Sequence, residues 1–300
     1  MLKKTKGKPK LVAILGPTAS GKTGLALRLA KQFRGEIVSA DSRQAYKEMD
    51  IATAKPYKPA IPHHLIDILR PDQQLSVALY KKLALKAIKD IQKRNKLPFL
   101  VGGTGLYIQA IVDNFDYPKI KPNPRLRKQL EKQSTQTLFS LYKKLDPRGA
   151  KLIDKNNKRR LVRAIEVCKI SGKPYWLQRQ KQNILFDTLQ IGIKLPEREL
   201  KQNIAIRTKR MFKAGLYKEA KRVLRKYGKN LPVLQTIGYQ EFTDKKGGLK
   251  SIRDYKEILE EIKKHTFQYA KRQMTWFKRD KRIIWINNSY QAKKLIKKFL

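Results

Sequence analysis

At 300 residues, with 41% hydrophobic residues, the chain is long enough for about two domains with real cores. Lys and Arg number 70 against 24 Asp and Glu, and the resulting net charge of +46 makes nucleic acid the leading candidate partner. Lys-rich codon usage is an alternative source of part of this excess. The single cysteine excludes an internal disulfide and a cysteine-ligated zinc site. We expect no signal peptide and no membrane span, hence a soluble cytoplasmic protein.

The first motif is GPTASGKT, residues 16–23, which matches the phosphate-loop template G-x-x-x-x-G-K-[ST]. It follows the apolar run LVAIL, and a helix is expected from Lys22 to about Phe33. The glycines let successive backbone N–H groups point at a phosphate, and Lys22 neutralises a second one. The Thr23 hydroxyl is a ligand for Mg²⁺. The motif therefore predicts that a phosphorylated compound binds here.

Strand and helix patterns alternate through the first third of the chain. EIVSA and PFLVGG read as buried strands, and residues 76–96 between them read as a long amphipathic helix. This alternation predicts a parallel sheet with right-handed crossovers. The expected fold is α/β, a P-loop NTPase-like parallel sheet flanked by helices, with an inserted basic all-helical domain.

The carboxylates near the strand ends bear on the reaction. Nucleoside triphosphatases hold Mg²⁺ through an acidic residue that ends another strand, but PFLVGG runs into Thr104 with no carboxylate. Asp41 instead follows EIVSA, one strand after the phosphate loop, and we expect it beside that loop. Asp41 could be a metal ligand or a base. The alternative is that Asp41 caps the next helix.

The pattern changes after Tyr107. Residues 113–125 form a Pro-rich connection, and helical periodicity follows from about Pro124 to Gln180. Between Lys119 and Asn183 there are 19 Lys and Arg against 4 Asp and Glu, a net charge of +15. We expect residues 1–115 and 184–300 to form one core, and residues 116–183 to form a basic helical insert. The second core segment should contain a strand within 183–195, helices within 207–228 and 253–280, and a late strand at 282–287.

Four further residue types have plain structural explanations. Cys168 lies in a helical pattern and is expected to be buried. Trp276 and Phe277 lie at the end of a helical pattern, where packing is favoured over stacking on a base. His63 and His64 are adjacent, so their side chains point in different directions and form a poor metal pair.

Seven segments carry a family resemblance: GPTASGKT, SADSRQAYKEMDIATAKP, PHHLIDI, VGGTGLYIQAI, NNKRRLVRAIEVCKISGKP, IGYQE and YAKRQMTWFKRD. Together, from about Leu11 to Asp280, they resemble the tRNA dimethylallyltransferase family, also called tRNA isopentenyltransferases. The resemblance implies transfer of a dimethylallyl group from its pyrophosphate to the exocyclic amine of the adenosine directly 3′ of the anticodon. The phosphate loop would then hold the departing pyrophosphate, and no phosphoryl group would move.

The resemblance also implies roles for individual residues. Asp41 is expected to be the base, Thr104 to contact the reacting groups, and Arg207 to lie near the pyrophosphate. Mg²⁺ is expected at Thr23. The expected pyrophosphate-binding residues are Gly16, Thr18, Ala19, Ser20, Gly21, Lys22 and Thr23. The expected tRNA-binding residues are Asp41, Ser42, Arg43, Gln44, Arg159, Arg160, Leu161, Val162, Arg163, Thr236, Ile237, Gly238, Tyr239, Gln240 and Glu241.

The partners implied by the resemblance are the anticodon stem-loop of tRNA, which the helical insert closes over, and dimethylallyl pyrophosphate. The adenosine has to be extruded from its stack to react. We expect a monomer that binds no membrane. Three positions differ from the family pattern: Ala52 replaces a common glycine, Arg43 a hydrophobic residue, and Phe267 an arginine.

Two other functions remain open from the residues alone. One is a nucleotide or small-metabolite kinase, which would bind a nucleoside triphosphate. The other is an RNA-binding module whose loop only recognises a phosphate and for which Asp41 is dispensable. The missing carboxylate after PFLVGG, together with Asp41 after EIVSA, favours transfer to a base-activated amine.

Overall fold

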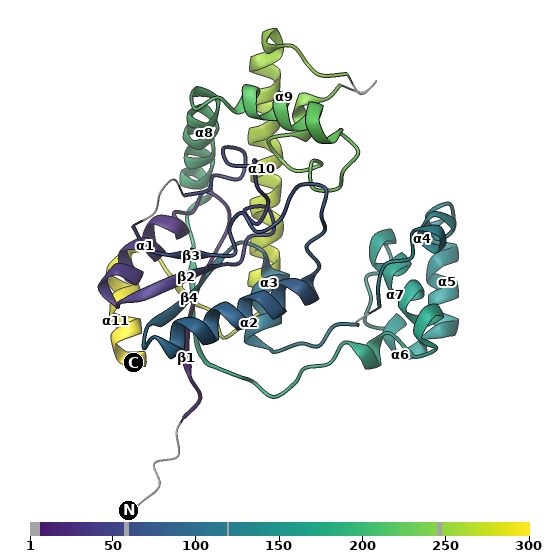
Figure 1. Cartoon of the computed structure of the whole chain (residues 1–300), viewed down its shortest axis with the longest axis horizontal. Helices are drawn as coiled ribbons and strands as arrows, with labels where there is room; N and C mark the ends of the chain where they lie inside the picture. Colours follow the sequence, from purple (N-terminus) through teal and green to yellow (C-terminus); the bar gives the residue numbers. More distant parts are fainter. Residues whose placement is uncertain (1–6, 57–59, 119, 245–247) are drawn as a thin grey trace, which may run out of the picture. The chain divides into compact units, whose positions relative to one another are not determined.

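The structure is a computed structural model of the chain, and it describes residues 7–56, 60–118, 120–244 and 248–300. Its centre is a six-stranded sheet in which every pairing is parallel (Figure 1), as the alternating pattern predicts. The strand order is β3-β2-β4-β1-β5-β6. The strands are β1 (Lys10–Leu15), β2 (Gly35–Ser39), β3 (His63–His64), β4 (Leu97–Gly102), β5 (Asp187–Ile193) and β6 (Ile284–Ile286).

Helices cover both faces of the sheet because its strands are apolar on both sides. On β1, Leu11, Ala13 and Leu15 pack in the same cluster as buried residues of α2 (Val77–Lys93) and α3 (Gly105–Val112). The alternate residues Val12 and Ile14 pack with α1 (Lys22–Gln32) and α11 (Ser289–Phe299), which lie next to each other in Figure 1. This period of two is the geometry of an extended strand.

The strand order corrects one expectation from the sequence. Asp41 follows β2, but β2 is not the neighbour of β1, because β4 pairs with both of them. The other side of β1 is taken by β5. Asp41 is therefore separated from the phosphate loop by the width of one strand. The strand β3 and the helix α11 were not predicted; β3 has only two residues, too few to show a period.

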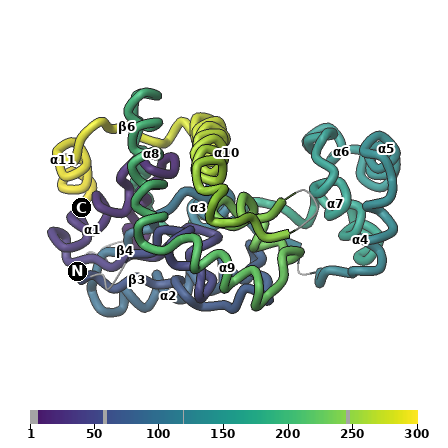
Figure 2. Tube along the Cα trace, turned by 90° about the horizontal axis from the view of Figure 1, so that it is seen from above, coloured from purple at the N-terminus to yellow at the C-terminus, as the bar shows by residue number. Residues whose placement is uncertain are grey.

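Three helices after β5 form a smaller core of their own. They are α8 (Glu197–Lys213), α9 (Leu216–Tyr227) and α10 (Tyr255–Phe277), and α8 lies beside α10 in both Figure 1 and Figure 2. Buried residues of α9 and α10 pack against Tyr46 and Met49 from the segment after β2. Short 3₁₀ helices η2 (Gln240–Phe242) and η3 (Ile252–Asp254) lie between α9 and α10 in the chain. This core therefore supports the loop that carries Asp41.

The chain divides into two compact units, and Asp113–Ile184 forms the second by itself. It is all helical among its described residues apart from one isolated bridge, with α4 (Pro124–Glu131), α5 (Thr135–Leu145), α6 (Pro147–Ala150), α7 (Lys158–Ser171) and the 3₁₀ helix η1 (Trp176–Gln178). Cys168 is buried in its core, as expected. In neither unit do the described residues include a helix with the length and hydrophobicity that crossing a bilayer requires.

A buried carboxylate fixes α4 against α7 within this helical unit. Glu166 is fully buried and accepts hydrogen bonds from the Asn123 N–H at 2.7 Å and from Arg127 Nε and Nη2, each at 2.8 Å. Arg163 Nη1 also donates to it, at 2.5 Å. Burial raises the pKa of Glu166, but the bonds from Arg127, Asn123 and Arg163 outweigh burial, so the net pKa is lowered.

We predict that Glu166→Gln loosens α4 without disturbing the sheet. The neutral amide loses the charge assistance of both arginines, which costs about 1.5–3 kcal/mol. Hydrogen exchange of the full chain should show faster exchange at the α4 amides and unchanged exchange in β1 and β4. Because the folded pKa of Glu166 is lowered, the parent should lose the same protection as the pH falls below about 4.5, its unfolded value. Equal α4 protection in parent and variant at pH 7 would contradict this role.

Candidate active site

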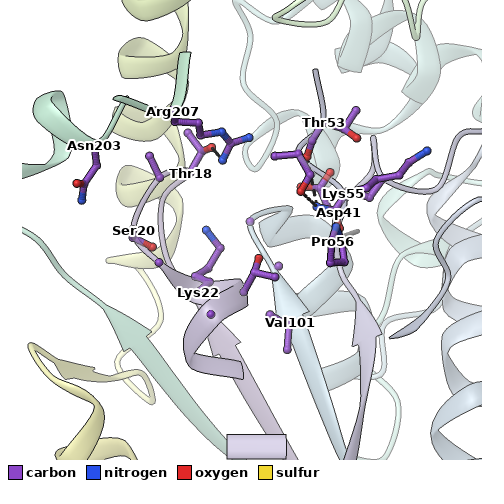
Figure 3. A pocket seen from close by; sticks show the side chains of 18 of the residues that line it. Thr18, Ser20, Lys22, Asp41, Thr53, Lys55, Pro56, Val101, Asn203 and Arg207 are labelled. Carbon is purple, nitrogen blue, oxygen red and sulfur yellow. Dashed lines mark hydrogen bonds between the residues drawn. The ribbon is translucent and has the colours of Figure 1, made fainter. Parts of the chain in front are cut away.

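A cavity of about 1040 Å³ opens where β1, β2 and β4 end. Loops that leave the carboxyl ends of parallel strands converge at one edge of the sheet, so this is the expected place for a ligand site. Residues of the phosphate loop, including Lys22, form one side of the cavity, and Asp41 lies across from them (Figure 3). Side chains of α8 and α10, among them Arg207 and Gln273, complete the lining.

The phosphate loop has the backbone of an anion site. Ala19 and Gly21 have φ values of 62° and 84°, and such left-handed residues turn successive N–H groups to one side. Helix α1 begins at Lys22 with no side-chain cap, so its N-terminal N–H groups stay available. The Ser20 hydroxyl is buried and has no hydrogen-bond partner among the described residues. These donors fit a phosphate group.

Gly16 serves the loop in another way. A Cβ at this position would lie 2.9 Å from the carbonyl oxygen of Ile193, at the end of β5. Gly16 is not part of the cavity lining, whereas the other six residues expected to bind pyrophosphate all line it. Gly16 therefore acts on the shape of the loop.

Two cations converge on the cavity. Arg207, from α8, donates to the Thr18 hydroxyl at 3.1 Å, and Lys22 Nζ donates to the carbonyl oxygen of Pro17 at 2.5 Å. Burial, followed by repulsion from Arg207, lowers the pKa of Lys22 to about 7, although Asp41 opposes the shift. Burial also lowers the pKa of Arg207. An anion between Lys22 and Arg207 would relieve this repulsion.

Asp41 presents a carboxylate oxygen to the cavity. Its Oδ1 accepts from the backbone N–H of Arg43 at 2.8 Å, a turn that fixes the side chain. No donor among the described residues reaches Oδ2. The alternative that Asp41 caps a helix is wrong, because the described residues between Asp41 and Val77 contain no helix. The free oxygen can accept a proton or bind a cation.

Thr104 lies just behind the cavity lining. Its hydroxyl accepts from the Ser42 N–H at 3.1 Å, and its own N–H donates to the Ala40 carbonyl at 3.1 Å. Tyr269, which does line the cavity, is hydrogen-bonded to Thr104. Burial and the nearby Asp41 raise the pKa of Tyr269 to about 12, so its hydroxyl stays protonated. Thr104 thus holds the Asp41 loop, and direct contact with reacting groups remains a prediction.

Gln273, to which the sequence analysis gave no role, joins two loops of the site. Its Oε1 accepts from the Thr18 N–H at 2.8 Å, and its Nε2 donates to the Gly103 carbonyl at 2.8 Å. The Thr18 N–H is therefore engaged by Gln273 and is not free for a phosphate. One sequence pattern could have indicated this role: Tyr269 and Gln273 are four residues apart, so their polar side chains lie on one face of α10.

Another group missed from the sequence anchors residues 50–56, all of which except Ala52 line the cavity. Glu219 of α9 is buried and accepts from the backbone N–H groups of residues 50, 51 and 52 at 2.8–3.0 Å. Lys55 donates to Asp50 at 2.6 Å and to Asp67 at 2.5 Å. These bonds hold an irregular segment in one conformation.

The expected tRNA-binding residues of the helical unit differ in exposure. Arg159 and Arg160 are exposed on α7 and available to a phosphate. Leu161 and Val162 are buried, so their side chains are unavailable to RNA and serve the core. Arg163 is bound to Glu166 and to the carbonyl of Ile120. Among the five expected residues of this helix, Arg159 and Arg160 are therefore the two whose side chains are exposed.

The remaining expected tRNA contacts lie in two loops of the first unit. Gln44 lines the cavity and bonds to Ser39 at 3.2 Å, whereas Ser42 and Arg43 lie beside the lining. In the other loop, Tyr239 and Glu241 are buried. Glu241 accepts from the Gly238 N–H at 2.8 Å, and Tyr239 donates to Glu219 at 2.8 Å. Residues 236–241 therefore brace the loop at 50–52.

Two of the three departures from the family pattern, Ala52 and Phe267, are accommodated by packing. Ala52 does not have a positive φ, and it packs where a Cβ on Gly238 would lie 2.8 Å away. Phe267 packs against the small cluster of Leu200, Ile204 and Ala270, and the ammonium groups of Lys201 and Lys271 lie 4.9 and 4.6 Å from its ring centroid. Trp276 and Phe277 pack in the core, as expected.

The two adjacent histidines have different partners. His64 Nε2 lies 2.8 Å from Glu36 Oε2, and His63 Nδ1 lies 2.7 Å from the carbonyl oxygen of Ile61. Among the described residues, no group of three or more His, Cys, Asp or Glu could hold a metal. The donor set nevertheless fits Mg²⁺ bound mainly by pyrophosphate oxygens, since the Thr23 hydroxyl lines the cavity beside the loop and Mg²⁺ prefers oxygen ligands and retains waters.

Comparisons with known proteins agree with this geometry. The family model described as IPP transferase matches residues 44–280, and the one described as isopentenyl transferase matches residues 9–63. The tRNA dimethylallyltransferase of Roseiflexus sp. is 44% identical over 277 residues, which cover 90% of each chain. That of Halothermothrix orenii is 43% identical and covers 93% of this chain and 88% of its own.

Solved structures that superimpose on the chain belong to the same family. The tRNA isopentenylpyrophosphate transferase of Bacillus halodurans superimposes with a TM-score of 0.66 at 37% identity, over 93% of this chain and 90% of its own. A eukaryotic dimethylallyltransferase acting on tRNA superimposes with a TM-score of 0.78 at 27% identity, over 94% of this chain and 75% of its own. The chain therefore belongs to the tRNA dimethylallyltransferase family.

Proposed function

We propose that this enzyme transfers a dimethylallyl group from dimethylallyl pyrophosphate to the exocyclic amine of the adenosine 3′-adjacent to the anticodon of tRNA. One observation carries the proposal: across one cavity, a phosphate loop with two converging cations faces a carboxylate whose Oδ2 has no donor among the described residues. The relatives' names supply the substrate class, and the cavity supplies a place for each reacting group.

The chemistry requires one bond to form and one to break. The adenine amine attacks the allylic carbon, the carbon–oxygen bond to pyrophosphate breaks, and pyrophosphate departs with the bonding electrons. Lys22, Arg207 and the loop N–H groups stabilise that negative charge. The amine is a weak nucleophile because its lone pair is delocalised into the ring, so Asp41 accepts its proton as the new bond forms.

The same proposal includes the partners of the site. Mg²⁺ bound at Thr23 and at the pyrophosphate oxygens would neutralise charge on the leaving group. The helical unit would contact the anticodon stem through its basic surface. We further propose a monomer acting in the cytoplasm. We also propose that residues 1–115 and 184–300 act as the catalytic core and residues 116–183 as the basic, tRNA-binding insert.

A kinase with the same loop is less consistent with the strand ends. The strands on either side of β1 are β4, which runs into Gly103 and Thr104, and β5, which runs into Lys194 and Leu195, so neither ends in a carboxylate that could hold a nucleotide-bound Mg²⁺. Incubation with unmodified tRNA and either labelled dimethylallyl pyrophosphate or labelled ATP tests the function directly. Label in the RNA from the first compound alone is the expected result, and label from ATP would contradict the proposal.

We predict that Asp41→Asn lowers the single-turnover rate of transfer by about 10²–10⁴ and leaves tRNA affinity nearly unchanged. Asparagine keeps the bond from the Arg43 N–H but cannot take the proton. The measurement is transfer with enzyme in excess, beside tRNA binding. Asp72→Asn, an exposed aspartate in the same unit, is the matched control. Equal rates for parent and Asp41→Asn would remove the base assignment.

A second prediction concerns the protonation of Lys22. Its pKa of about 7 leaves it partly neutral in the free enzyme, and a bound pyrophosphate would raise that pKa. Binding of dimethylallyl pyrophosphate should therefore take up about half a proton at pH 7 and nearly one at pH 8. Affinity should fall by up to about tenfold per pH unit above 7.

Calorimetry in buffers of different ionisation enthalpy measures this proton uptake. Lys22→Arg is the control, because arginine stays charged throughout this pH range and should abolish the uptake. Binding of dimethylallyl pyrophosphate to the parent at pH 8 without proton uptake would show that Lys22 does not have a lowered pKa in the free enzyme.

The third prediction tests the bridge made by Gln273. Gln273→Leu removes both bonds, so the phosphate loop should lose its fixed position, and kcat/KM for dimethylallyl pyrophosphate should fall about 10- to 100-fold. Gln273→Glu keeps an acceptor for the Thr18 N–H and loses only the donor to Gly103, so its loss should be smaller. Equal losses in the two variants would show that the Thr18 bond does not matter.

A further inference from the structure

Helix α9 presents a row of cations on one side. Lys218, Lys221, Arg222, Arg225 and Lys226, here called the α9 basic surface, recur at spacings of three and four and together line a shallow hollow of about 580 Å³. The row from Lys218 to Arg225 spans about 10 Å along the helix. The helix lies apart from α11 in both Figure 1 and Figure 2.

Most of this positive charge is uncompensated. Lys226 pairs with Glu48 at 2.9 Å, and Arg222 donates to the Glu48 carbonyl. Among the residues that the structure describes, no carboxylate lies within salt-bridge distance of Lys218, Lys221 or Arg225. Like charges three and four residues apart on a helix repel each other. A bound polyanion would relieve that repulsion.

The other side of α9 is built into the active site. Ala220 and Val223 are buried in the core beneath the Asp41 loop. Glu219, between the cations in sequence, binds the N–H groups of residues 50–52, which line or adjoin the cavity. The α9 basic surface is therefore held at a fixed place relative to the cavity.

We propose that the α9 basic surface binds the sugar-phosphate backbone of the tRNA substrate. The proposal rests on the proposed function, because that function brings an RNA to this cavity. All five side chains are Lys or Arg, which suits phosphates, and contacts to phosphates carry no direct sequence information. The surface thus adds affinity and register for any tRNA whose adenosine enters the cavity.

The test compares salt dependence of tRNA binding. The variant is Lys218→Gln/Lys221→Gln/Arg225→Gln, which spares the two residues bound to Glu48; glutamine keeps a similar helix propensity. The control is Lys294→Gln/Lys297→Gln/Lys298→Gln on α11, with the same loss of three charges in the same unit. Dissociation constants for unmodified tRNA are measured between 50 and 300 mM salt, and transfer is measured at saturating tRNA.

The α9 variant should show a slope of log Kd against log salt that is shallower by about 2 to 3, whereas the α11 control keeps the parent's slope. Both should retain transfer at saturating tRNA. The parent's slope in the α9 variant, or equal flattening in both variants, would overturn the proposal. Failure of the parent to transfer dimethylallyl would contradict the proposed function alone, since the binding slopes still decide the role of α9.

A crosslink locates the contact. The chain has one cysteine, Cys168, which is buried, so Lys221→Cys supplies a single exposed site for a thiol-linked photocrosslinker. Lys294→Cys is the control. Crosslinking of tRNA from position 221, and little from position 294, is the expected result. Equal yields from both positions would overturn the proposal.

Discussion

The cavity depends on one constraint: loops that leave the same edge of the sheet approach one another at backbone contact distance. A Cβ on Gly102 would lie 2.2 Å from the Ala40 carbonyl, and one on Gly103 would lie 2.2 Å from Gln273. A Cβ on Gly105 would meet Trp276 at the same distance. At Gly102, where the neighbour is backbone, only glycine allows such a contact, and at Gly103 a Cβ would displace the Gln273 amide from its present position. The segment after β4 is therefore glycine-rich because of packing, and this packing sets the positions of Thr104, Gln273 and Asp41.

The strand order explains why this phosphate loop suits group transfer to a separate nucleophile. With β4 between β1 and β2, the loop and Asp41 leave strands that are roughly 10 Å apart. A carboxylate directly after β4 would lie against the phosphates, as in nucleoside triphosphatases. Lys22 and Asp41 line the same cavity, so under the proposed function the allyl group and the incoming amine would lie between them. The leaving group and the proposed base would then occupy opposite sides of the cavity.

The sequence predicted the parts whose signal is local. The phosphate loop, the five longer strands and the helical insert follow from motif, period and charge. The expectation that Asp41 lies beside the phosphate loop missed the strand β4 between them, because a buried apolar run shows that a strand is covered on both faces but not which strands flank it. Gln273 and Glu219 escaped notice because each is a polar residue in a helical pattern, where solvent exposure is the ordinary expectation. The backbone groups that they bind in the site loops lie at least 167 residues away in the chain.

The buried cations of the cavity and the exposed cations of α9 differ in what controls their affinity for an anion. Lys22 and Arg207 are desolvated and repel each other, and Asp41 offsets only part of this electrostatic cost in the free protein, so an anion in the cavity would relieve the rest in a pH-dependent way. The cations of α9 stay largely in water, where salt screens them and their affinity for a polyanion depends on ionic strength. Glu219 links the two regions, because it lies on α9 and holds the loop that lines the cavity. The affinity for a small anion in the cavity therefore depends on Lys22 and Arg207, whereas the affinity for a polyanion depends on the α9 basic surface, and both sets of side chains belong to one unit.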